Sequence, residues 1–153
     1  GVPVCCTSWN DNAGSGSGTE AGCAIGLSNG ILAFLRSRVE QMPGHSLKGD
    51  IVVDLDVMAT VPAAHAGLLI TSLQPISGQR LISSGLDSLL RIWAQTSGEE
   101  LAQIVTDLRG GVNAISVHPC DDEHLLCCGD DGRVLVYNAA RASSGLPDLG
   151  TPP

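Results

Sequence analysis

A short hairpin pattern occurs twice in this chain, and the step from Asp87 to Asp131 sets the spacing of the copies at 44 residues. The copies read SSGLDSLLRIW at residues 83–93 and CCGDDGRVLVY at residues 127–137. In each copy a polar turn that carries the aspartate separates two apolar runs, which is typical of an antiparallel strand pair. A period of roughly 40 to 45 residues indicates a repeating four-stranded unit that must stack on its neighbours to bury its apolar faces.

A looser third copy lies upstream, where GLSNGILAFL at residues 26–35 places Asn29 and Leu35 at the aspartate and aromatic positions. The spacing from turn to turn is longer here, 58 residues, and the proline and two glycines of residues 38–50 indicate a loop that accounts for the excess. The sequence therefore predicts an all-β chain of about three four-stranded antiparallel units, at about residues 1–37, 51–93 and 101–138.

The second unit resembles a repeat of the WD-repeat β-propeller family. His65 precedes the first strand of the unit, Ser83 lies on the second strand, Asp87 lies in the turn, and RIW ends the third strand at Trp93. The resemblance implies that these four side chains form a buried chain of hydrogen bonds. The residue types suit this role, because tryptophan only donates, ionised aspartate only accepts, and a hydroxyl and an imidazole do both. The third unit keeps Asp131 alone, and the first unit keeps none of the four.

The resemblance covers about residues 2–138 and implies a partial β-propeller, the C-terminal blades of a larger ring. The nearly continuous apolar runs of the first and third units indicate strands that are covered on both sides. We therefore expect the remaining propeller blades to be partners of this chain. Gly/Ser-rich composition predicts a flexible loop at residues 10–22, and residues 139–153 have the composition of a disordered tail.

The function implied by the resemblance is a non-enzymatic scaffold, a subunit that binds other proteins in a multiprotein complex. The alternative is an enzyme or a metal-binding module built on a propeller. Neither a catalytic residue nor a cofactor or metal is predicted, because no nucleophile with its base and no cofactor cradle is present. Loops on a rigid scaffold commonly carry recognition, and the third unit has Arg109-Gly110 where the family usually has Gly-His. We therefore expect partner contacts at Arg109, Asp130 and Arg133.

Charge and hydropathy narrow the range of partners. The net charge is −8 and the sequence pI is about 4.7, which argues against direct nucleic-acid binding because a phosphate-binding face is basic. No segment reaches the roughly 18 consecutive apolar residues of a membrane span, and no basic region precedes an apolar one at the N-terminus. Four of the six cysteines form two adjacent pairs inside predicted strands, Cys5-Cys6 and Cys127-Cys128, which favours reduced, packed thiols. We expect an intracellular protein, cytoplasmic or nuclear, without a membrane partner.

Two patterns suggest catalysis or phosphate binding but have simpler explanations. His65, Ser83 and Asp87 are the residue types of a hydrolase triad, yet the G-x-S-x-G elbow is missing and the hydrogen-bonded chain explains all three. The segment GSGSG at residues 14–18 has neither the lysine nor the following helix of a phosphate loop, so a flexible linker is favoured.

Two further patterns concern metals and charged partners. One histidine and cysteine set has a spacing that zinc could use, but its members fall on a strand end and a buried strand position, which favours loop histidines and packed thiols. These residues are His118, Cys120, His124 and Cys127. An acidic cluster is either a solvated loop with one structural turn aspartate or a docking surface for a basic partner. The cluster consists of Asp121, Asp122, Glu123, Asp130 and Asp131.

Overall fold

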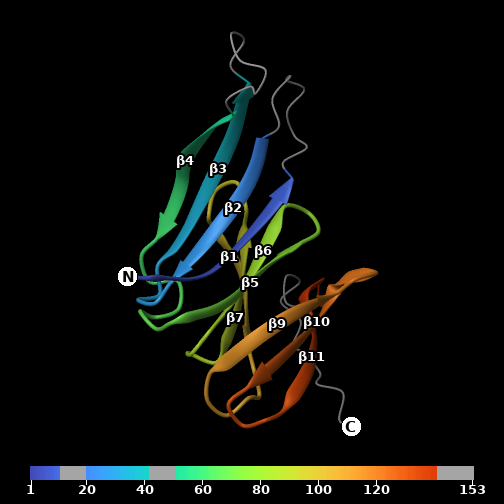
Figure 1. Ribbon diagram of the computed structural model, residues 1–153. Helices are drawn as coiled ribbons and strands as arrows, with labels where there is room; N and C mark the ends of the chain where they lie inside the picture. The colour runs from blue at the N-terminus through green and yellow to red at the C-terminus, as the bar shows by residue number, and fades with distance from the viewer. Residues whose placement is uncertain (11–19, 42–50, 141–153) are drawn as a thin grey trace.

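Three antiparallel sheets make up the chain in the computed structural model, which describes residues 1–10, 20–41 and 51–140. The sheets follow one another in chain order, and the second packs against both of the others (Figure 1). The all-β antiparallel architecture expected from the repeat is thus confirmed. Within the described residues, the structure contains no helix with the length and hydrophobicity that crossing a bilayer requires.

Each sheet is a simple meander in which consecutive strands pair. The first sheet contains β1 (Pro3–Asn10), β2 (Glu20–Leu27), β3 (Leu32–Gln41) and β4 (Ile51–Val61). The second sheet contains β5 (Ile70–Ile76), β6 (Arg80–Gly85), β7 (Leu89–Ala94) and β8 (Glu100–Val105). The third sheet, as far as the chain is described, contains β9 (Val112–His118), β10 (Asp121–Gly129) and β11 (Val134–Asn138).

The sheets are offset by one strand from the expected units. β4 begins the expected unit 51–93, but it pairs along its whole length with β3 and completes the first sheet. β8 lies at the start of the expected unit 101–138, but it pairs with β7 in the second sheet. The repeat period fixes the length of a unit and not its starting point, so hairpin pairing decides which sheet each strand joins.

The strands also extend further than expected. The expected loop 10–22 overlaps β2, which starts at Glu20, and the expected loop 38–50 overlaps β3, which runs to Gln41. Polar residues continue this ladder, with Glu20 opposite Arg38, because backbone groups make its hydrogen bonds. The expected tail starts later than residue 139, since Ala139 is fully buried against the third sheet. The rest of the two loops and of the tail, residues 11–19, 42–50 and 141–153, lies outside the described residues.

The second sheet is buried on both faces, which explains its dense apolar sequence. Trp93 and Leu81 face the first sheet and join a cluster that includes Phe34. Ile82 and Ile92 face the third sheet and join a second cluster there. A leucine or isoleucine that is fully buried in this way contributes about 1.5 to 3 kcal/mol. These two clusters hold the three sheets together.

The hairpin turn between the second and third strands of each sheet contains one residue with positive φ. This residue is Gly30 in the first sheet (φ 75°), Ser88 in the second (φ 64°) and Gly132 in the third (φ 74°). The left-handed conformation is costly for serine, which has a Cβ, and costs glycine nothing. The Ser88 hydroxyl compensates by donating a hydrogen bond to the carbonyl oxygen of Gly110, at the start of the third sheet. Ser88 thus connects two sheets at the expense of local strain.

Two substitutions of Ser88 separate the strain from the hydrogen bond. Both Ser88→Ala and Ser88→Gly remove the hydroxyl, but only alanine keeps the strained conformation. We expect Ser88→Ala to be less stable than Ser88→Gly by about 1 kcal/mol, measured by urea unfolding monitored with far-ultraviolet circular dichroism. Equal unfolding free energies for the two variants would contradict the strain at this position.

Candidate functional site

The four side chains singled out in the second unit lie in hydrogen-bond contact. Trp93 Nε1 donates to Ser83 Oγ at 2.8 Å, and Ser83 Oγ lies 2.7 Å from His65 Nε2. His65 Nδ1 lies 2.7 Å from Asp87 Oδ1, which also accepts the backbone N–H of Leu89 at 3.2 Å. These hydrogen bonds therefore link the loop before β5 to β6, to the β6–β7 turn and to β7.

The chemistry of the donors fixes the direction of this chain. Because the Trp93 indole can only donate, the Ser83 hydroxyl accepts a hydrogen bond from it and donates its own hydrogen bond to His65 Nε2. The Nδ1 of neutral His65 then carries the ring proton and donates it to Asp87. Burial lowers the pKa of His65, against the raising effect of the Asp87 carboxylate, and this favours the neutral ring. A protonated ring would donate from both nitrogens and leave the Ser83 proton without an acceptor.

This chain of hydrogen bonds is closed to solvent. His65 and Ser83 are fully buried, and Trp93 is 2% exposed. The Ser83 hydroxyl already contacts both the indole and the imidazole, so a substrate would have no path to it in this arrangement. The second carboxylate oxygen of Asp87, Oδ2, lies 3.7 Å from Arg91 Nη2. Arg91 Nη1 also forms an ion pair with Glu100 Oε2 at 2.8 Å.

The third sheet makes the same connection with different groups. Asp131 Oδ2 accepts the backbone N–H of Arg109 at 2.8 Å, where the second sheet uses the imidazole of His65. This hydrogen bond, with contributions from Arg133, lowers the pKa of Asp131 to about 2. At the position equivalent to Trp93, the Tyr137 hydroxyl accepts the backbone N–H of Asp107 at 2.9 Å. Backbone donors thus replace the side-chain donors of the second sheet.

The three residues expected to contact partners lie close together at the end of the third sheet near the β10–β11 turn. They differ in whether their side chains already have partners within the described chain. Arg133 is committed to an ion pair with Asp131 at 2.7 Å. Asp130 accepts hydrogen bonds from Asn113 Nδ2 at 2.8 Å and from the backbone of Gly111 at 3.3 Å. Arg109 is exposed, and in the described part of the chain its guanidinium has neither an ion pair nor a hydrogen bond.

Two exposed leucines on the neighbouring loops were not singled out from the sequence. Leu68 is 46% exposed and Leu86 is 40% exposed. The backbone N–H of Leu86 donates to the carbonyl oxygen of Leu69 at 3.0 Å, so the two loops are joined. Leu86 also lies over Gly111, where an added Cβ would be 2.5 Å from its Cδ2. The sequence signal that could have identified these exposed leucines is their position in the turn segments HAGLL and GLDS. We call Leu68, Leu86 and Arg109 the loop surface.

Cys127 is separated from the other three residues considered for zinc. Cys127 is buried in the cluster between the second and third sheets, where burial raises its pKa to about 11. His118, Cys120 and His124 are exposed at the β9–β10 end of the third sheet. No group of three or more histidine, cysteine, aspartate or glutamate side chains in the described ranges could hold a metal ion.

The acidic cluster is divided between two ends of the third sheet. At the β9–β10 end, Glu123 forms an ion pair with Arg80 of the second sheet at 2.6 Å, and Asp121 lies 2.6 Å from the His124 ring. Asp130 and Asp131 lie at the opposite end, in the β10–β11 turn. The side chain of Asp122 lies outside the described part. The cluster is therefore not one continuous acidic surface.

Three stacked antiparallel sheets, with the turn aspartate of the second and of the third sheet bound to the loop that enters that sheet, define blades of a β-propeller. No family model matches the chain. Comparisons with individual proteins and solved structures do find relatives. The chain is 33% identical over 93 residues to the ribosome biogenesis protein WDR12 homolog of Chlamydomonas reinhardtii, a match that covers 55% of this chain and 21% of that protein.

Solved structures with the same fold include a chain from a humanized mutant of the Chaetomium thermophilum Polycomb Repressive Complex 2 bound to the inhibitor GSK126. The TM-score is 0.65 at 14% identity, over 90% of this chain and 28% of that one. The C-terminal WD40 domain of Sif2 gives a TM-score of 0.62 at 18% identity, over 97% of this chain and 36% of that one. The chain thus shares the fold of the blades of WD40 β-propeller domains, and it spans between about a fifth and about a third of the length of these relatives.

Loss of the Asp87 carboxylate should destabilise the second sheet. Asp87→Ala leaves the buried His65 Nδ1–H and the Leu89 N–H without an acceptor, at a cost of about 1 to 3 kcal/mol in the free energy of unfolding. Asp87→Asn is the matched control, because its amide oxygen can still accept and should retain part of this stability. Thermal and urea unfolding measure both variants. If Asp87→Ala lost a binding or catalytic activity while its melting curve stayed unchanged, a purely structural role would be wrong.

Stability should also fall on mild acidification. Because the pKa of His65 is lower in the folded chain than its ordinary value of about 6.5, the unfolded chain binds the proton more readily. Stability is therefore complete above that ordinary value and is lost as the pH falls below it. We expect a lower urea midpoint at pH 5.5 than at pH 7.5. His65→Gln should be less stable at pH 7.5 but should show a smaller change between the two pH values; an unchanged difference would exclude His65 as its source.

Proposed function

We propose that this chain is a non-enzymatic protein-interaction scaffold and that the loop surface of Leu68, Leu86 and Arg109 contacts a partner. The observation that carries the proposal is the exposed guanidinium of Arg109, which has no ion pair or hydrogen bond within the described residues. It belongs to a loop whose Gly111 lies against the exposed Leu86. Exposed apolar side chains next to an uncommitted charge are typical of protein-binding surfaces. Asp130 and Arg133 belong to the proposed contact region, where they hold the backbone around Arg109 in place.

The loops that carry this surface are held at both ends. In the loop before β5, Ala64 N–H donates to the Gly30 carbonyl of the first sheet at 2.8 Å, while His65 contacts Asp87 of the second. In the loop before β9, Thr106 Oγ1 donates to the Ser88 carbonyl at 2.7 Å, while the Arg109 N–H donates to Asp131. A surface that is already ordered loses little conformational entropy on binding, which favours recognition by these loops.

The partners in this proposal are other proteins of a multisubunit complex. Support comes from the relatives, since one is a ribosome biogenesis protein and another is part of Polycomb Repressive Complex 2. The net charge of −8 supports protein partners over direct nucleic-acid binding. An intracellular location, cytoplasmic or nuclear, belongs to the same proposal.

Further propeller blades are the second kind of partner that we propose. On the outer face of the third sheet, Leu126, Val134 and Val136 are 47%, 64% and 61% exposed. On the first sheet, Leu55 and Val57 are 56% and 65% exposed. In the described chain the equivalent faces between sheets are covered by the neighbouring sheet. Repeats that stack in this way need a neighbour or a polar cap at each end.

Charge reversal at Arg109 tests the proposed surface. We expect Arg109→Glu to remove at least one protein that copurifies with the tagged chain, because it replaces the exposed cation with a repelling charge. Arg109→Lys keeps the charge and should retain more of that partner, and Leu86→Asp should remove it as well. Quantitative mass spectrometry of the copurified proteins gives the readout, and unchanged melting curves show that the variants are folded. Retention of every partner by Arg109→Glu would exclude this surface.

A further inference from the structure

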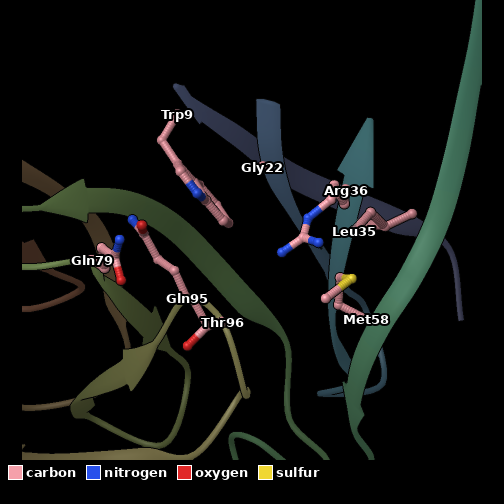
Figure 2. Close-up of a pocket in the computed structure, with 8 residues that line it drawn as sticks. All are labelled: Trp9, Gly22, Leu35, Arg36, Met58, Gln79, Gln95 and Thr96. Atoms are coloured by element: carbon pink, nitrogen blue, oxygen red, sulfur yellow. The ribbon is translucent and has the colours of Figure 1, made fainter. Parts of the chain in front are cut away.

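A second surface lies at the opposite end of the sheets, in a pocket between the first and second sheets. Trp9 at the end of β1, Arg36 of β3 and Met58 of β4 form one wall, and Gln79, Gln95 and Thr96 from two turns of the second sheet form the other (Figure 2). The loop surface is at the other end of the strands, so this pocket does not depend on the function proposed for that surface.

An irregularity in the first sheet directs Met58 to the pocket. The β3–β4 register shifts between two pairs, Phe34 with Ala59 and Leu35 with Val57, so Met58 is the extra residue of a β-bulge. Bulges re-aim a side chain and are common near functional sites. Met58 lines the pocket while 41% of it remains exposed. Its flexible thioether side chain can adjust to the shape of a bound group.

A strained residue lies on the opposite wall. Gln79 has a φ of 56°, a left-handed conformation that is costly for a residue with a Cβ. Its carbonyl oxygen accepts the backbone N–H of Gln95 at 2.9 Å, and the Gln95 amide donates to the Arg80 carbonyl oxygen at 2.9 Å. Gln95 is only 8% exposed, so this wall is fixed. The first and second sheets thus each contribute a backbone irregularity to the same pocket.

The charge in the pocket is opposite to that of the chain as a whole. Among the described residues that line it, Arg36 carries the only charge, whereas the whole chain has a net charge of −8. Figure 2 shows the Arg36 guanidinium extending from β3 toward Trp9 and Gln95. Arg36 stands opposite Asp56 in the β3–β4 ladder, and a guanidinium has five N–H donors, more than one carboxylate can use. It can therefore hold a second carboxylate.

Trp9 supplies a flat apolar surface beside this cation. The indole lies so close over Gly22 that a Cβ added there would be 2.2 Å from the ring, so the absence of a side chain at residue 22 allows this position. The pocket is partly open to solvent and does not enclose a molecule. A small ligand gains affinity by being enclosed, whereas a protein segment needs only an anchoring point for one or two side chains.

We propose that this pocket docks a segment of a partner protein that carries an acidic residue next to an apolar one. The carboxylate binds the Arg36 guanidinium, and the neighbouring apolar side chain packs between Trp9 and Met58. The exposed side-chain amide of Gln79 is placed to contact the backbone of the segment. The wall fixed by Gln95 is preformed, and Met58 adapts to the side chain that enters.

Tryptophan fluorescence with two synthetic peptides tests the proposal on the full chain. The probes are N-acetyl-Ala-Leu-Glu-Leu-Ala-amide and the same peptide with glutamine in place of glutamate. We expect saturable changes in emission with the acidic peptide and binding about tenfold weaker with the glutamine peptide, because one charge-assisted hydrogen bond is lost. The difference should shrink at high salt. Equal binding of the two peptides, or no saturable change with the acidic one, would overturn the proposal.

Matched variants assign the signal to the pocket. Trp9→Phe should remove the emission change, because the other tryptophan, Trp93, is buried and does not line the pocket. Arg36→Gln should abolish the preference for the acidic peptide, whereas Arg133→Gln, at the other end of the sheets, should keep it. A preference that survives in Arg36→Gln would place binding elsewhere and overturn the proposal. The peptide pair tests the unaltered chain, so the result stands even if Arg36→Gln fails to fold.

Discussion

Burial of both faces of the second sheet is the constraint on which the rest of the structure depends. One face supplies Trp93 and Leu81 to the cluster with the first sheet, and the other supplies Ile82 and Ile92 to the cluster with the third. Polar atoms on a strand that is covered twice cannot be hydrated, so any polar side chain there needs a protein partner. The chain of hydrogen bonds through Ser83 is the solution to this requirement. It lets a hydroxyl and an indole N–H remain in a dry interface.

The second and third sheets solve the same geometric problem with different chemistry. In both, the aspartate in the turn between the second and third strands binds the loop that enters the sheet. Asp87 binds the side chain of His65, and Asp131 binds the backbone of Arg109. A backbone donor serves the structural purpose as well as an imidazole does. The side chain at that position is then released from a structural role, which is why Arg109 can extend into solvent.

These differences explain what could and could not be predicted from the sequence. The repeat and the strands could be predicted from residue type and spacing, and the resemblance to WD repeats implied the contact among the four side chains of the second sheet. The bond from the Arg109 backbone to Asp131 could not be, since every residue except proline has an N–H and residue type gives no signal. The pocket of Trp9, Arg36 and Gln79 was also invisible, because it joins segments that are distant in the sequence. The offset between units and sheets was missed because a period has no intrinsic starting point.

The position of the two aspartate contacts has a mechanical consequence. The loops that they bind, residues 62–69 and 106–111, are the only covalent connections between one complete sheet and the next in the described ranges. Each loop is hydrogen-bonded to a turn of the sheet that it leaves and to a turn of the sheet that it enters. A hinge requires a connection whose backbone torsions are free to change, and both connections have lost that freedom. The three sheets are therefore expected to move as one rigid body, so a force applied at one end is transmitted to the other without bending between the sheets.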